Sequence, residues 1–374
     1  VELVSLNKDS FIFESVEKVK IRGRYTIFGF NPDLVVETKT NCIIQNINNK
    51  KIVVKKNPYD YLNKLINNFN FKTSKKLPMM SAMLAGYFGY DIIRFKEKIP
   101  NNCKEDLKIP DVKLIRPQLI IIHDNEKNKI FFVQNIYNLK NIKNLKNLYL
   151  LKCDEINKFI AKINNTYNST EYLNKNKKKN KIISNVTKKS FLNSISKAKE
   201  LINNGEIFQV VLSQRFETIL NKTPINFYKK LRILNPSPFM FFFNFDNFKI
   251  AGSSPEILVR VRDNKITIRP IAGTRPRGRN FKEDNKFQKE LLNDKKEISE
   301  HLMLLDLGRN DVGKVSKIGS VKVDQKFKIE KYSHVMHIVS NVVGDFDNKN
   351  SLLDTLFSGF PAGTVSGAPK IRAM

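Results

Sequence analysis

Two glutamates with helical spacing are the first residues whose pattern could do chemistry. Glu297 and Glu300 stand three residues apart in the stretch Lys-Glu-Ile-Ser-Glu-His, so a helix would place both carboxylates on one side. Carboxylate oxygens that point into a polar cavity are ligands that Mg²⁺ prefers. The spacing alone fits an ordinary solvated helix face better than a metal site. Further along, Asp306 and Asp311 fit helix caps or ion-pair partners.

A loop rich in proline, glycine and arginine precedes these glutamates. It reads Ile-Arg-Pro-Ile-Ala-Gly-Thr-Arg-Pro-Arg-Gly over residues 268–278, with Gly273 and Thr274 between the two prolines. Proline restricts the backbone, so N–H groups in this loop could face a ligand. Arg275 and Arg277 could bind carboxylates through paired hydrogen bonds. An ordinary basic loop explains the same residues equally well.

Two histidines, His334 and His337, are also three residues apart. That spacing could form a metal pair on a helix, but Val335, Val339 and Val343 favour a strand. A strand would send the two histidines to opposite faces, so a zinc site is not expected. One histidine in a polar cleft, with His337 as the candidate, could exchange protons near neutral pH. A buried, hydrogen-bonded histidine is the alternative.

The stretch Gly-Thr-Val-Ser-Gly-Ala-Pro-Lys over residues 363–370 leads into a helix predicted to begin near Ala368. Glycine, hydroxyl groups and a helix N-terminus favour an anion. The stretch does not match a phosphate-binding Walker loop, because the glycine spacing differs and no Lys-Ser or Lys-Thr pair follows Gly367. A nucleotide hydrolase is therefore not indicated.

The three cysteines, Cys42, Cys103 and Cys153, include no Cys-x-x-Cys pair. Neither a disulfide framework nor a zinc ribbon is expected, and a reducing cytoplasm is the simplest compartment. No apolar run reaches about 18 residues, which predicts no membrane-spanning helix and no membrane partner. The first residues, Val-Glu-Leu, do not have the pattern of a signal peptide.

The net charge of +30 raises the possibility of a nucleic-acid partner. The charge is mostly lysine, however, and it accompanies abundant Asn and Ile in stretches such as 140–152 and 174–181. No recognition helix or RNA-binding aromatic pattern accompanies it. We therefore expect no nucleic-acid partner, and we interpret the charge as compositional drift on a solvated surface.

The first part of the chain is rich in predicted strands. Short runs of β-branched and aromatic residues separated by Asn, Gly and Pro predict strands over 21–30, 34–39, 42–47, 51–55, 119–123 and 130–133. A helix is predicted over Pro58–Phe71, with Asn57 as its cap and Pro58 at its first position. A Lys/Asn-rich linker follows from about residue 137, and it contains a helical pattern that includes Leu148 and Ile160.

Helices and strands also alternate in the second part. Thr187 is expected to cap a helix that ends at Gly205 and carries an apolar stripe of Phe191, Ile195, Ala198 and Ile202. Strands are expected over 208–216, 239–245, 257–262, 265–269, 321–329 and 333–343, with one helix over 284–305. This order indicates an α+β fold with large antiparallel sheets. We expect one domain over residues 1–180 and another over 181–374.

Taken together, these stretches resemble the chorismate-utilising enzymes, and among them anthranilate synthase component I. The resemblance implies antiparallel sheets packed as a sandwich and flanked by helices. It covers nearly the whole chain, and many motifs occur in the family's order. The resembling stretches are Phe13–Ser15, Gly23–Tyr25, Gly86–Asp91, Gly205–Phe216, Asn235–Phe241, Ser254–Glu256, 268–278, Glu297–Lys314, His334–Gly344 and Phe360–Met374.

Two positions discriminate within the family. Relatives that add water to chorismate carry a lysine base where this chain has Gln209, and a neutral amide suits ammonia, which is already a nucleophile. Aminodeoxychorismate synthases typically carry lysine at the position of Ala272. The resemblance therefore favours amination of chorismate and loss of pyruvate, which gives anthranilate in the first step of tryptophan biosynthesis. Aminodeoxychorismate synthase component I is the alternative.

The resemblance also assigns roles to residues. It implies Mg²⁺ between the ring carboxylate of the substrate and Glu300, with Glu297 bound directly or through water. Glu256 would protonate the departing hydroxyl, and His337 would act when a proton leaves C2. Gln209 would lie beside the nucleophile. The substrate would be positioned by Gly273, Thr274 and Thr364.

Partners and regulation follow from the same resemblance. Ammonia would come from a separate glutamine amidotransferase subunit, in a hetero-oligomer. Tryptophan would act as feedback inhibitor at a site formed by Glu14, Ser15, Asn235, Pro236, Met240 and Phe241, although core packing explains these residues equally well.

Family members continue beyond the position of Met374 with further metal and substrate residues, so we expect a C-terminal truncation. A non-catalytic remnant that still binds its partner is a further alternative.

Overall fold

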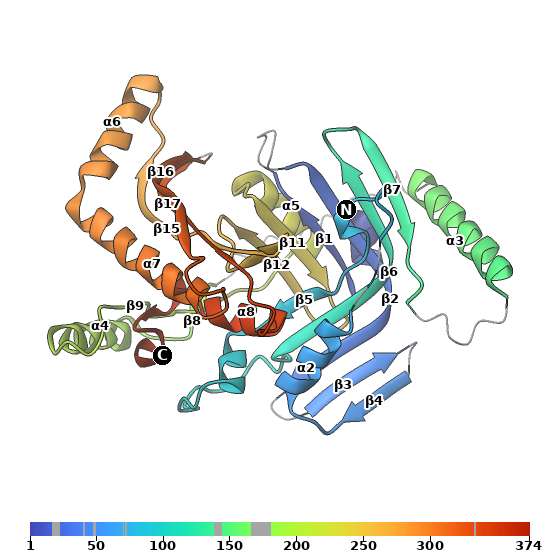
Figure 1. Cartoon of the computed structure of the whole chain (residues 1–374), viewed down its shortest axis with the longest axis horizontal. Helices are drawn as coiled ribbons and strands as arrows, with labels where there is room; N and C mark the ends of the chain where they lie inside the picture. Colours follow the sequence, from blue (N-terminus) through green and yellow to red (C-terminus); the bar gives the residue numbers. More distant parts are fainter. Residues whose placement is uncertain are drawn as a thin grey trace.

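The computed structural model describes residues 1–16, 23–39, 42–47, 50–69, 71, 73–137, 144–165, 181–332 and 334–374. In this part of the chain, two large antiparallel sheets of nine and five strands carry helices on their faces (Figure 1). This arrangement confirms the expected α+β class. The low-complexity residues 174–180, near which we placed a domain boundary, lie outside the described residues.

The first sheet combines strands from two distant parts of the sequence. Its main path is β12 (Lys249–Ser254), β11 (Phe239–Asn244), β1 (Ser10–Glu14), β2 (Tyr25–Lys39), β3 (Cys42–Ile47) and β4 (Lys50–Val54). A branch from β2 holds β6 (Val112–Asp124), which also pairs with β5 (Ala85–Phe88) and β7 (Lys129–Gln134). Because β11 pairs with β1, this sheet crosses the expected boundary at residue 180, and the two-domain division stays a prediction.

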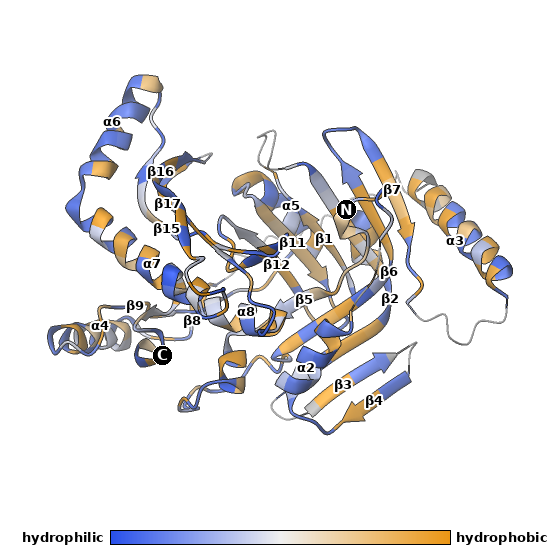
Figure 2. Ribbon diagram, in the orientation of Figure 1, coloured by the Kyte–Doolittle hydropathy of each residue, from blue (hydrophilic) through white to orange (hydrophobic). Residues whose placement is uncertain are grey.

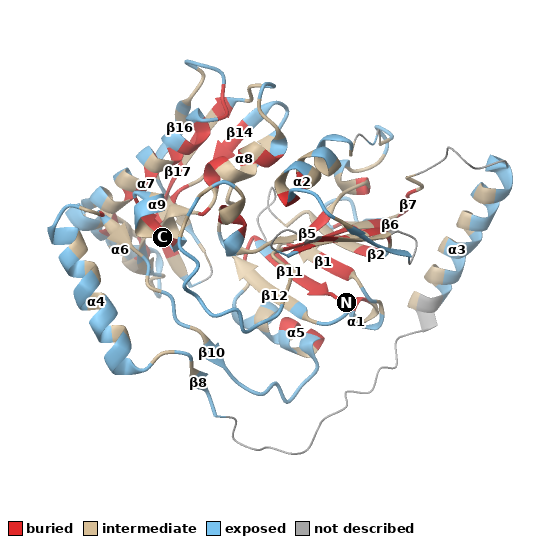
Figure 3. Ribbon diagram, turned by 90° about the horizontal axis from the view of Figure 1, so that it is seen from below, coloured by how far each residue is buried: buried red, intermediate tan, exposed pale blue. Residues whose placement is uncertain are grey.

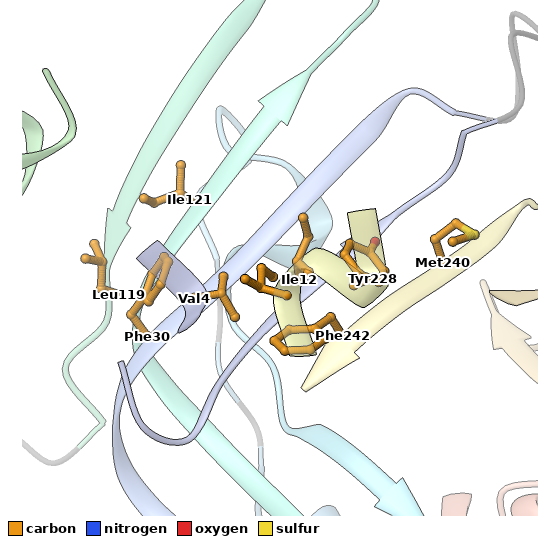
Figure 4. Close-up of a cluster of buried hydrophobic side chains, with 9 residues drawn as sticks. Val4, Ile12, Phe30, Leu119, Ile121, Tyr228, Met240 and Phe242 are labelled. Carbon is orange, nitrogen blue, oxygen red and sulfur yellow. The ribbon is translucent and has the colours of Figure 1, made fainter. Parts of the chain in front are cut away.

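Side chains alternate across β1 and β11, and each face builds its own core. Ile12 and Phe242 are opposite each other in the register and pack on one face with Tyr228 of α5 (Pro224–Leu234) (Figure 4). Phe11 and Phe243 form the next pair and pack on the other face. The helices α1 (Glu2–Leu6) and α3 (Leu145–Asn165) complete the first core. Figure 2 shows hydrophilic and hydrophobic residues alternating along α3.

The second sheet carries most of the residues with predicted chemistry. Its order is β13 (Arg260–Arg262), β14 (Lys265–Ile268), β17 (Val335–Asp345) and β15 (Ile271–Pro276), and β16 (Lys322–Lys331) also pairs with β17. It is covered by α6 (Phe281–Asn293) and α7 (Lys295–Gly313). Leu305 and Val312 of α7 pack on Ile268 and Val342, which fixes the helix against the sheet.

The helix α8 contacts both α2 and α7, and several short elements complete the fold. Leu353 of α8 (Leu352–Gly359) packs into the core cluster that contains Leu62 of α2 (Pro58–Asn67). Two ribbons are formed by β8 (Ile183–Ser184) with β10 (Phe216–Glu217) and by β9 (Gln209–Val210) with β18 (Gly367–Ala368). The remaining elements are η1 (Met79–Ser81), η2 (Tyr90–Phe95), α4 (Lys188–Asn203), η3 (Gly363–Val365) and α9 (Lys370–Ala373).

Several local predictions are confirmed. Asn57 caps α2 by accepting from the N–H groups of Tyr59 and Asp60, and Pro58 occupies the first turn. Thr187 caps α4 by accepting from the N–H of Ser190. Gly205 follows α4 with φ +74°, a conformation that glycine adopts without steric cost.

Other local predictions are wrong. The single helix expected over 284–305 is two helices, because Asp294 has extended ψ (106°) and caps α7. The strand expected over 208–216 is limited to its two ends, in β9 and β10. The helix expected after Thr187 is present as α4, but the structure describes all of its residues and none is fully buried (Figure 3): in its apolar stripe, Phe191, Ile195 and Ala198 are half-buried and Ile202 is exposed.

The α2–α8 contact is anchored by Asp354 in the first turn of α8. Its carboxylate accepts from the Tyr59 hydroxyl, from Lys96 Nζ at 3.0 Å and, as part of a capping box, from Ser351 N–H at 3.1 Å. Burial would raise the pKa of Asp354, but these hydrogen bonds outweigh burial and lower it. The contact therefore stabilises the fold most where the carboxyl is ionised.

We predict that Asp354→Asn lowers the free energy of unfolding by about 1–3 kcal/mol at pH 7. Because the folded-state pKa lies below 3.8, this contribution is present above pH 3.8 and is lost as the pH falls further. Urea unfolding at several pH values measures the difference. The matched control is Asp306→Asn, whose Arg309 partner is 56% exposed, and its effect should stay within about 0.5 kcal/mol. Equal losses for both variants would contradict the prediction.

Candidate active site

The first turns of α7 carry the two glutamates. Asp294 Oδ1 accepts from the N–H groups of Lys296 and Glu297 and so fixes the helix start. Arg275 of β15 joins the same turn, because its Nη2 lies 2.7 Å from Asp294 Oδ2 and its Nη1 lies 3.4 Å from Glu297 Oε1. Glu300 follows one turn later on the same side.

A bulge in β15 brings the loop backbone to His337. The pairing of β15 with β17 shifts register between Ala272 and Thr274, and Gly273 has φ +66°. His337 Nδ1 lies 2.9 Å from Gly273 O and 3.1 Å from Thr274 Oγ1. A carbonyl oxygen can only accept, so Nδ1 carries the proton and donates it to Gly273 O. In the neutral imidazole this tautomer leaves the lone pair on Nε2.

Gln209 connects the β9–β18 ribbon to α7. Its Nε2 donates to Glu300 Oε1 at 3.3 Å, and its backbone pairs with Ala368. The Oε1 atom of Gln209 is buried and has no hydrogen-bond partner among the described residues. A buried acceptor without a donor is costly, so this atom would be satisfied by a ligand that carries N–H groups.

Glu256 lies in a small cavity that continues along α7. Thr364 Oγ1 donates to Glu256 Oε2 at 3.4 Å, and both line a cavity of about 200 Å³ with Leu304, Leu307 and Asp311. Burial raises the pKa of Glu256 to about 7, and the hydrogen bond from Thr364 opposes that shift only in part. A carboxyl group of this kind holds a proton near neutral pH and can donate it.

Successive turns of α7 contact different parts of the candidate site. Its first turns touch β15 through Glu297 and the β9–β18 ribbon through Glu300. Two further turns face the cavity of Glu256 through Leu304 and Leu307. His337 joins the group through Gly273, because a Cβ built on that glycine would lie 3.2 Å from Glu297 Oε2.

The two loop arginines bind carboxylates, as the sequence allowed. Arg277 binds both carboxylate oxygens of Asp284, and Arg275 binds Asp294 and Glu297. Both guanidinium groups therefore hold carboxylates of the chain itself. His334 precedes β17 and is exposed.

The residues expected to bind tryptophan fall into two groups. Glu14, Ser15, Met240 and Phe241 line a cavity of about 460 Å³ at the ends of β1 and β11. The Ser15 hydroxyl is buried without a described partner. The remaining two, Asn235 and Pro236, belong to the connection between α5 and β11 and are not among the described residues that line it.

The Glu14 side chain is already engaged. It accepts from the Tyr228 hydroxyl at 2.6 Å and from Arg232 Nε at 2.8 Å, on the side of the sheet that faces α5. Met240, which is opposite Glu14 in the register, also packs on that side. Phe241 packs with Phe13 on the other side of the sheet, so the aromatic wall of the cavity comes from that side.

The sequence as a whole matches one protein family. Residues 9–374 match the family described as chorismate binding enzyme. The chain therefore belongs to the chorismate binding enzymes.

Relatives place the chain more narrowly within this family. The anthranilate synthase component 1 of Acetivibrio thermocellus is 43% identical over 97% of this chain and 74% of its own length. That of Cereibacter sphaeroides is 41% identical over 100% of this chain and 76% of its own length. The crystal structure of anthranilate synthase component I from Streptococcus pneumoniae TIGR4 has a TM-score of 0.80 and 31% identity over 96% of this chain and 76% of that one. The chain thus belongs with anthranilate synthase component I.

We predict that Gly273→Ala destabilises the protein more than Gly319→Ala. Both glycines have positive φ (+66° and +76°), so an alanine costs about 1–2 kcal/mol at either position. At Gly273 the new methyl group would also lie 3.0 Å from Leu291 Cδ1, whereas nothing lies within 4 Å at Gly319. Thermal unfolding should show an additional loss of about 1–3 kcal/mol for Gly273→Ala. Equal melting temperatures would show that the bulge tolerates a side chain.

Proposed function

We propose that this chain converts chorismate to anthranilate. Ammonia adds at C2 of the ring while the C4 hydroxyl leaves as water, and pyruvate is then eliminated as the ring becomes aromatic. This reaction makes the enzyme a lyase. The observation that carries the proposal is the convergence of a buried carboxyl with a raised pKa (Glu256), an imidazole whose Nδ1 is held by a backbone carbonyl (His337) and a buried amide acceptor (Gln209) around α7. Relatives named anthranilate synthase component 1 support it.

Two of these groups move protons, and the third orients the nucleophile. Glu256 gives its proton to the departing hydroxyl, because burial keeps this carboxyl protonated near neutral pH. His337 Nε2 accepts the proton that leaves C2, since Nδ1–H is held by Gly273 O. Gln209 Oε1 accepts an N–H from ammonia, and a neutral amide leaves the ammonia unprotonated. The substrate lies against Gly273, Thr274 and Thr364.

Mg²⁺ is the cofactor that we propose for this reaction. Glu297 and Glu300 supply oxygen donors from one side of α7, and Mg²⁺ is commonly bound by one or two carboxylates while it keeps several waters. The described residues contain no group of three or more His, Cys, Asp or Glu that could hold a metal, so the donor set fits a hydrated ion that also binds the substrate. When bound, Mg²⁺ would withdraw electron density from the ring carboxylate.

We also propose the partner and the regulator. The designation of the relatives as component 1 implies a second component, which we take to be a glutamine amidotransferase that supplies ammonia. Tryptophan would bind in the cavity near Ser15, whose volume of about 460 Å³ lies within the range for small-molecule sites. The backbone connects this cavity to the proposed acid Glu256. Met240, which lines the cavity, pairs with Ser253 of β12, and β12 ends two residues before Glu256.

None of the described helices is both long and apolar enough to cross a membrane, and we propose the cytoplasm as the compartment.

The first test supplies chorismate, ammonium and Mg²⁺ to the full-length protein. Fluorescent anthranilate is the expected product, and Glu300→Gln should lower its rate of formation by about 10²-fold or more. Asp306→Asn is the matched control, because Asp306 is on the same helix and exposed. A 4-amino product without fluorescence would favour aminodeoxychorismate synthase. Release of no product despite binding of the amidotransferase would identify a remnant.

The pH dependence of the rate tests the role of Glu256. An acid with a pKa of about 7 is deprotonated above that pH, so the rate should fall about tenfold per pH unit on the alkaline side. Thr364→Val removes the hydrogen bond that lowers the pKa of Glu256, and the alkaline limb should move to higher pH. Glu256→Gln should lose both the rate and this limb. If the alkaline limb of the pH–rate profile stays in place in Thr364→Val, the limb belongs to a group other than Glu256.

A further inference from the structure

Lys370 lies where three helices meet, and the chemistry above does not use it. Its Nζ is 2.5 Å from Asp311 Oδ2 of α7 and donates to Gly359 O at the end of α8 at 3.1 Å. The side chains of Lys370 and Asp311 are only 10% and 6% exposed. Lys314 reaches the other carboxylate oxygen of Asp311 from the surface, at 3.3 Å and with 60% exposure. Lys370 is therefore the buried cation of this cluster.

The hydrogen bond from Lys370 Nζ to Gly359 O closes the loop formed by residues 359–370. Gly359 ends α8 and Lys370 begins α9, so one ammonium joins both ends of the segment between them, which carries Thr364. The middle of this loop lies tightly on α7, because a Cβ on Gly363 would collide with Leu307. The Asp311 carboxylate then fastens the closed loop to the same helix.

Net stability does not explain why this position is charged. Burying an ammonium and a carboxylate costs solvation energy, and apolar residues of similar volume often serve as well. Burial lowers the pKa of Lys370, while Asp311 opposes that shift. The geometry gives the ammonium a different task, because its N–H groups bind two oxygens in fixed directions, Asp311 Oδ2 and Gly359 O.

We propose that Lys370 is a positioning residue that fastens the 359–370 loop to Asp311 and so excludes water from Glu256. Asp311, Thr364 and Glu256 line the same cavity of about 200 Å³, so a loop that lifts from α7 would open the cavity to solvent. The charged groups of this cluster are Lys370, Asp311 and Lys314. The kinetic consequence rests on the proposed function, but the closure of the loop does not.

The test compares Lys370→Met/Asp311→Asn, which removes both charges, with Lys314→Met, which removes only the exposed cation. Hydrogen exchange followed by mass spectrometry should show the 359–370 segment exchanging at least about tenfold faster in the double variant. Carboxyl ¹³C NMR, assigned by comparison with Glu256→Gln, should show the Glu256 titration moving from about 7 towards 4.5. The Lys314→Met protein should match the wild type in both measurements.

Unchanged exchange and an unchanged Glu256 titration in the folded double variant would overturn the proposal. If the double variant does not fold, Lys370→Gln applies the same test, because its amide is too short to span both oxygens. The alkaline limb of the rate profile should move to lower pH together with the NMR titration. If no anthranilate is formed, exchange and NMR still decide the role of Lys370, so its failure is distinguishable from failure of the proposed function.

Discussion

The packing of α7 on the second sheet is the constraint on which the rest of the site depends. Leu305 and Val312 bury against Ile268 and Val342, and burying one such side chain is worth about 1.5–3 kcal/mol. This fixes the rotation of α7 about its axis. Once the rotation is fixed, the directions of the other side chains are fixed as well, and consecutive turns meet β15, the β9–β18 ribbon and the cavity of Glu256. One apolar contact thus positions residues from distant parts of the chain.

The chain as a whole is positively charged, but the ionisable groups that organise the site are carboxylates. The chain carries a net charge of +30, yet the site is organised by carboxylates, each with a distinct partner. Arg275 holds Glu297, Gln209 holds Glu300, and Thr364 holds Glu256. A cation, an amide and a hydroxyl give three carboxylates three different environments. Burial, opposed in part by the Thr364 hydroxyl, is what raises the pKa of Glu256, and the metal that we propose would bind the other two carboxylates.

The two sheets are connected through few elements, and these elements bear on the proposed chemistry. Asp354 joins α8 to α2 of the first half of the chain, and α8 ends where the loop that carries Thr364 begins. On the other side, β11 and β12 belong to the first sheet, and β12 runs directly into Glu256. The acid is thus held between a strand from one sheet and a loop supported by the other.

The sequence by itself determined the features that depend on near neighbours: the caps at Asn57 and Thr187, the glycine at 205 and the spacing of Glu297 and Glu300. The motifs were sufficient to indicate the family, because they specify chemistry in a fixed order. Only the tertiary structure decided that Arg275 and Arg277 bind the protein's own carboxylates, that the stripe of α4 is at most half-buried and that Lys370 meets Asp311. Periodicity reports which face of an element is apolar, but not which distant element covers it. Such pairings arise from packing between residues that are far apart in the sequence, and local sequence patterns carry no information about them.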